Sequence, residues 1–100
     1  MELKELALAF MKSVLDENEM SNLFRYTTSR TIFFSIDEKK EVPMEECLTK
    51  IKPYIEKEPA IYMSPVCVKF VYTKKAQEQL HVYFEAKGGR FTRLEYSIKK

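Results

Sequence analysis

Residues 78–98, with the sequence EQLHVYFEAKGGRFTRLEYSI, decide the fold of this 100-residue chain. Apolar and polar residues alternate on both sides of a Gly-Gly pair, a pattern typical of two antiparallel strands joined by a tight turn. We expect a three-residue loop, Lys87-Gly88-Gly89, because this register keeps apolar side chains opposite one another. A two-residue loop would set Arg93 against Phe84 on the buried face, which is energetically costly.

Two further strands are predicted upstream of this hairpin. Residues 60–73 form one of them, with an irregularity at Pro65, and extend the hairpin to a three-stranded meander. Residues 30–37 (RTIFFSID) form the other, with Ile32, Phe34 and Ile36 on the buried side. The sequence leaves open whether this first strand runs parallel or antiparallel to the meander.

Two helices complete the predicted fold. Apolar residues recur at three- and four-residue steps in residues 2–16 and again after Pro43. Pro53 interrupts this second helix, so we expect either a kink at Lys52 or a second short helix from Pro53 to Lys57. The element order is therefore α-β-α-β-β-β. This order predicts an α+β two-layer sandwich in which two helices cover one face of a four-stranded, mainly antiparallel sheet. Residues 1–100 are expected to form a single domain.

The composition limits the class of protein. Apolar residues make up 45% of the chain and charged residues 32%, which is typical of a folded globular protein. No apolar stretch approaches the 18 residues of a membrane-spanning helix, and no secretory signal is present. Two cysteines are too few for a disulfide framework. We therefore expect a cytoplasmic protein that does not enter a membrane, with the redox state of Cys47 and Cys67 left open.

One set of residues could support nucleophilic catalysis. Cys67, His81 and Glu95 fall on the same side of the predicted strands, but no oxyanion-hole motif accompanies them. The chain also lacks a phosphate-binding glycine loop, a calcium loop and closely spaced zinc ligands. The sequence therefore predicts a protein that is not an enzyme and that has no cofactor, no metal and no catalytic residues.

The exposed face of the meander is the predicted binding surface. In the preferred register it combines three anchor residues, two of them aromatic, with three basic residues at its rim. The predicted anchors are Tyr83, Phe91 and Arg93, and the predicted rim residues are Lys69, Lys87 and Arg90. Tyr, Phe and Arg are enriched at protein interfaces. This face favours a small protein-binding or regulatory module whose partner is another protein or a second copy of the chain. The sequence identifies neither the partner nor the oligomeric state.

Two alternatives remain for the function. Aromatic rings among basic residues also suit single-stranded nucleic acid, and Lys and Arg exceed Asp and Glu by five in residues 61–100. A small-ligand pocket between helix and sheet is the second alternative, because methionines can adapt to a ligand. The methionines considered for that pocket are Met11, Met20, Met44 and Met63.

Overall fold

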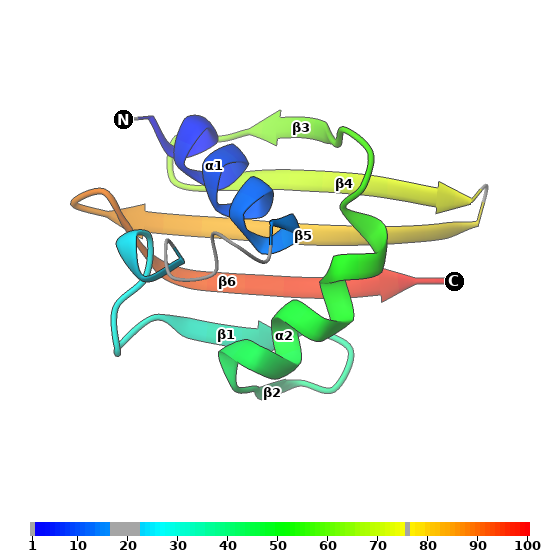
Figure 1. Cartoon of the computed structure of the whole chain (residues 1–100), viewed down its shortest axis with the longest axis horizontal. Coiled ribbons are helices and arrows are strands. Elements are labelled where there is room, and N and C mark those ends of the chain that lie inside the picture. The colour runs from blue at the N-terminus through cyan, green and yellow to red at the C-terminus, as the bar shows by residue number, and fades with distance from the viewer. Residues whose placement is uncertain (1, 17–22, 76) are drawn as a thin grey trace.

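A computed structural model describes residues 2–16, 23–75 and 77–100 of the chain, which form a sheet with helices on one face (Figure 1). The sheet has six strands in the spatial order β2-β1-β6-β5-β4-β3. Neighbouring strands are antiparallel except β1 and β6, which run parallel. The strands are β1 (Ile32–Ser35), β2 (Lys40–Glu41), β3 (Ala60–Met63), β4 (Val68–Lys75), β5 (Glu78–Lys87) and β6 (Arg90–Lys99).

The helices lie where the apolar spacing predicts them. Helix α1 spans Leu3–Leu15, and helix α2 spans Met44–Ile51. A short 3-10 turn, η2 (Lys52–Tyr54), continues α2 past Pro53, where a kink at Lys52 or a second short helix over residues 53–57 was expected. The ring of Pro53 removes a backbone donor, which prevents a further α-helical turn. Neither helix in the described residues has the length and apolar run that crossing a bilayer requires.

The predicted class, α+β with two helices, is confirmed, but the four-stranded, mainly antiparallel sheet is wrong in detail. The stretch predicted as one strand over residues 60–73 reverses direction near Pro65 and becomes β3 and β4. The backbone N–H of Ser64 donates to the carbonyl of Cys67 (2.9 Å) and closes this turn. A second small hairpin, β1–β2, forms because Lys39 adopts a positive φ of 57°.

The buried side of β1 is the opposite of the predicted one. Phe33 lies opposite Leu94 and is buried, whereas Ile32 and Phe34 lie on the outer face and are half-buried. Ser35 lies opposite Tyr96, and their side chains are hydrogen-bonded beneath the helices. A small hydroxyl side chain thus leaves room for the Tyr96 ring, which an aromatic side chain in its place would not.

The β5–β6 hairpin also differs from the predicted register. Its loop has two residues, Gly88 and Gly89, with φ of 64° and 79°, so Lys87 faces Arg90. Glycine suits both positions because side chains disfavour positive φ. The expected clash of Arg93 with the apolar face does not arise, because a β-bulge at Thr92 shifts the pairing by one residue and sets Phe84 opposite Leu94.

The bulge determines the centre of the core. Phe91, which lies before the bulge, turns toward the helices, and its ring centroid is 5.2 Å from those of Phe10 and Phe84. Further ring contacts connect Phe84 to Phe70 (5.2 Å) and Phe70 to Tyr72 (6.2 Å). Aromatic side chains therefore fill the space between α1 and the middle of the sheet.

Candidate functional site

The outer face of the sheet, which the helices leave uncovered, carries three of the predicted contact residues. Lys69 and Tyr83 are directly opposite each other on β4 and β5, and both are half-buried. The Lys69 ammonium lies 5.4 Å from the centroid of the Tyr83 ring and 5.8 Å from that of Tyr62. The basic partner of Tyr83 on this face is therefore Lys69.

Arg93 is on the same face but its charge is already paired. Its Nε donates to Glu95 Oε2 over 2.6 Å, and its guanidinium carbon lies 5.0 Å from the centroid of the Phe34 ring. Tyr83 lies opposite Glu95, whereas the three-residue loop expected from the sequence would have set it opposite Arg93. The charge of Arg93 in the middle of the outer face is thus balanced by that of Glu95.

The remaining predicted contact residues lie elsewhere. Lys87 and Arg90 flank the β5–β6 turn and are exposed there. The placement of Phe91 on the exposed face is wrong: its side chain is 1% exposed and packs in the core, because the bulge at Thr92 reverses its direction. Phe91 is therefore a structural residue.

The Cys67–His81–Glu95 set does not come together. His81 lies opposite Val71 and Ser97, whereas Cys67 precedes β4, four residues from Val71. At about 3.3 Å per residue this places Cys67 and His81 roughly 13 Å apart along the strands, beyond hydrogen-bond reach. Instead, His81 Nε2 lies 3.1 Å from Gln79 Oε1.

Cys67 occupies a small hollow of about 160 Å³ on the outer face, together with Glu85, Arg93 and Glu95. Partial burial and the nearby Glu85 carboxylate raise the pKa of the Cys67 thiol, so the unreactive protonated form is favoured. Cys47, the other cysteine, lies on the buried side of α2. No cluster of three or more metal-ligating side chains occurs in the described part of the chain.

A larger opening lies on the helix side of the molecule. Figure 1 shows α1 crossing the sheet, with β3 and the segment that leads into it at one side. Between α1 and this segment is a groove of about 700 Å³, which we call the α1–β3 groove. Its lining residues are Lys4, Glu5, Leu8, Ala9, Met11, Lys12, Leu15, Ile55, Glu56, Lys57, Glu58, Pro59, Ile61 and Tyr72.

The groove separates apolar walls from a charged rim. Leu8, Met11 and Leu15 form the α1 wall, and Ile55 and Ile61 form the opposite wall. Leu15 remains 38% exposed, which is high for a large apolar side chain near the core.

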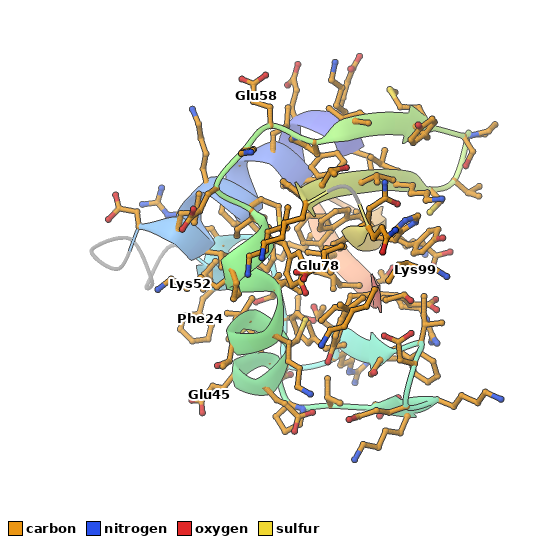
Figure 2. The ribbon with its side chains drawn as sticks, turned by 90° about the vertical axis from the view of Figure 1, so that its right-hand side faces the viewer. Phe24, Glu45, Lys52, Glu58, Glu78 and Lys99 are labelled. Carbon is orange, nitrogen blue, oxygen red and sulfur yellow. The ribbon has the colours of Figure 1, made fainter. Side chains whose placement is uncertain are left out.

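The charged residues of the rim point largely to solvent. Glu5, Lys12, Glu56, Lys57 and Glu58 are exposed, and Lys4 is half-buried. Figure 2 shows the Glu58 side chain pointing away from the body of the protein. Three cations and three anions contribute to the lining, so their formal charges cancel.

Among the residues that line the groove, Tyr72 has the one ionisable side chain that is shielded from solvent. It lies on the inner face of β4 and is 2% exposed. Burial raises the pKa of its phenol well above the usual range, so the hydroxyl stays protonated. No described residue hydrogen-bonds this hydroxyl, and every fully buried polar side-chain atom has a partner, so the Tyr72 oxygen retains contact with the groove.

The methionines considered in the sequence for a ligand pocket do not predict this groove well. Of the methionines considered for a ligand pocket, Met11 lines it, whereas Met63 is 62% exposed on β3 and Met44 is half-buried on α2. Met20 lies outside the described residues. Leu8, Met11 and Leu15 do follow helical spacing beside the buried stripe of α1, which is the signal that could have indicated a second apolar surface.

Comparison with known proteins identifies the fold. No family model and no curated protein matches the sequence. Among solved structures, an NTF2-like protein of unknown function from Cytophaga hutchinsonii is 13% identical with a TM-score of 0.70, over 98% of this chain and 90% of that one. AclR from Streptomyces galilaeus, a candidate hydroxylase, is 13% identical with a TM-score of 0.69, over 96% of this chain and 77% of that one.

A candidate SnoaL-like polyketide cyclase from Shewanella putrefaciens is 12% identical with a TM-score of 0.70, over 95% of this chain and 78% of that one. At these identities the likeness establishes the fold alone, which is NTF2-like. The fold of this chain is thus a known arrangement carried by a sequence of low identity.

These neighbours overturn the predicted function. Those described by an activity are candidates for a hydroxylase and a polyketide cyclase, so the prediction of a protein-binding or regulatory module is wrong. The expectation that the chain is not an enzyme conflicts with the same two neighbours. The contacts predicted with a second copy or with nucleic acid stay predictions.

Proposed function

We propose that this protein binds a small, predominantly apolar molecule in the α1–β3 groove. The observation that carries the proposal is the groove itself, about 700 Å³ in volume, with apolar walls and a buried phenol on its lining. Ligand sites in proteins are typically concave, mostly apolar and about 300–1,000 Å³ in size, with a few well-placed polar groups.

The position of the groove follows from the packing of the core. The rings of Phe10, Phe84 and Phe91 are in mutual contact beneath α1, so the middle of the helix–sheet interface is closed. Open space lies toward the β3 side, where Leu8 and Leu15 line the groove together with the segment leading into β3. A bound apolar molecule would cover these side chains and remove their surface from water.

The chemistry of the lining favours binding over proton abstraction. A general base must be held near the substrate and partly shielded from water. The groove carboxylates, Glu5, Glu56 and Glu58, are exposed at the rim, and within the described lining Tyr72 is the one buried ionisable group. A protonated phenol can donate a hydrogen bond and polarise an oxygen, but it cannot accept a proton from carbon.

An uncharged apolar dye tests the proposal directly. N-phenyl-1-naphthylamine becomes fluorescent in apolar sites, and we expect saturable binding to the native protein. Ala9→Phe places a ring in the groove from the α1 wall and is expected to weaken binding at least about tenfold, or 1.4 kcal/mol.

Thr49→Phe is the matched control, because it adds the same ring at an exposed position of α2 outside the groove. This variant should bind the dye as the native protein does. Absence of saturable binding by the native protein, or equal binding by Ala9→Phe, contradicts the proposal.

A further inference from the structure

We infer that the α1–β3 groove selects an uncharged ligand that carries a carbonyl oxygen, and that this oxygen accepts a hydrogen bond from the hydroxyl of Tyr72. This inference rests on the proposed function and adds the chemical class of the ligand. It follows from the hydrogen-bonding state of Tyr72, from the charge balance of the rim and from the position of the nearest cation on β4.

The unpartnered hydroxyl of Tyr72 is the first observation. The side chain is 2% exposed and ends the series of ring contacts through Phe70, so its ring is held in place. Buried polar groups in native proteins nearly always have a hydrogen-bond partner, and the fully buried side-chain atoms in the described residues follow this rule. The Tyr72 hydroxyl, which has no such partner in the described chain, can therefore bond a ligand without breaking an existing contact.

The direction of this hydrogen bond follows from protonation. Burial raises the pKa of Tyr72, so the phenol carries its proton throughout the physiological range and donates it to an acceptor. A carbonyl oxygen is a strong acceptor that has no proton of its own, so it fits a donor on an apolar wall. A hydrocarbon of the same shape would leave the hydroxyl without a partner.

Two observations argue against a charged ligand. The lining contributes three cations and three anions, so neither sign is favoured at the rim. Lys74, two residues after Tyr72 on the same face of β4, places its ammonium 5.4 Å from the centroid of the Tyr54 ring and is not among the lining residues. A carboxylate beside Tyr72 would lose hydration without meeting a net positive charge in the lining, which is costly.

The test compares a ligand with and without its carbonyl. Prodan, a neutral naphthalene dye with one ketone, changes its emission when that ketone accepts a hydrogen bond. The matched analogue has a propyl group in place of the propionyl group. We expect the native protein to bind prodan about tenfold more tightly than the analogue, the value of one neutral hydrogen bond.

Tyr72→Phe should remove this preference, leave the affinity for the analogue unchanged and shift the emission of bound prodan to the blue. Tyr54→Phe is the control, because it removes a phenol hydroxyl from a residue that does not line the groove. This variant should retain the preference for the ketone.

The outcomes separate the two proposals. If neither dye binds the native protein, the proposed function fails and the inference with it. If both bind equally, or if Tyr72→Phe keeps the preference, the assignment of Tyr72 is overturned while the groove remains a binding site. Tighter binding of a naphthoate of the same size than of prodan would overturn the selection of a neutral ligand.

Discussion

The carboxylate of Asp37 joins the turn after β1 to Ser97 on β6, a residue 60 positions away in the sequence. Asp37 Oδ1 accepts a hydrogen bond from the Ser97 hydroxyl (2.7 Å), and Oδ2 accepts one from the backbone N–H of Ile98 (2.9 Å). The adjacent N–H of Ile36 donates to the carbonyl of Tyr96 (2.9 Å). These bonds hold the one parallel strand pair of the sheet in register.

Asp37→Ala should therefore lower the free energy of unfolding. Hydrogen bonds to a charged group contribute roughly 1.5–3 kcal/mol, and this carboxylate accepts two of them. We expect a loss of about 2–3 kcal/mol in urea-induced unfolding. Glu38→Ala is the control, because its ion pairs to Lys40 and Lys50 are exposed and 3.8–3.9 Å long and exposed pairs contribute only about 0–1 kcal/mol. Equal losses for the two variants would contradict the structural role of Asp37.

A second prediction separates Phe91 from Tyr83, which the sequence placed together on one surface. Phe91→Ala removes a core ring that contacts Phe10 and Phe84, and should cost about 3–5 kcal/mol of stability. Tyr83→Ala removes a half-buried ring of the outer face and should cost clearly less. Urea unfolding of both variants provides the comparison. A smaller loss for Phe91→Ala than for Tyr83→Ala would show that the bulge is not formed as described.

These residues also show how far the sequence predicts the fold. Alternation and helical spacing place α1, α2 and the β5–β6 hairpin correctly, because these signals are local. The parallel pairing of β1 with β6 depends on contacts such as Asp37–Ser97, which join distant parts of the chain and leave no periodic pattern. Strict alternation of apolar and polar residues likewise cannot predict the bulge at Thr92. Without the bulge, Phe91 is assigned to the exposed face of the sheet, which is wrong.

The candidate site was harder to predict than the fold. A groove arises where two elements fail to close against each other, so it depends on the distance between α1 and the segment before β3. In the sequence, Tyr72 looks like any other inward-facing residue of a strand, because burial alternates between it and its neighbours Val71 and Thr73. Only the absence of a partner for its hydroxyl in the described structure marks it as different from Tyr96.

The two cysteines should differ sharply in reactivity. Partial burial, with Glu85 adding a smaller contribution, raises the pKa of Cys67, so its alkylation by iodoacetamide should be slower than that of free cysteine at neutral pH and should accelerate as the pH rises. Cys47 is 0% exposed, and burial raises its pKa to about 12, so it should react only after unfolding. Mass spectrometry of peptides from the native protein measures both rates.

Glu85→Gln removes a carboxylate that raises the pKa of Cys67, so it should speed the alkylation of that thiol at neutral pH. It should leave the rate at Cys47 unchanged. Faster labelling of Cys47 than of Cys67 in the native protein would contradict the burial of the α2 side.

The last prediction compares two buried tyrosines by removing their hydroxyls. The Tyr96 hydroxyl is hydrogen-bonded to Ser35, so Tyr96→Phe should reduce the free energy of unfolding by about 1 kcal/mol. The Tyr72 hydroxyl has no partner among the described residues and contacts the open groove, so Tyr72→Phe removes no bond within the described chain. We expect its stability to equal or exceed that of the native protein in urea unfolding without ligand. A loss as large as that of Tyr96→Phe would mean that the Tyr72 hydroxyl is bonded within the chain and is not free to bind a ligand.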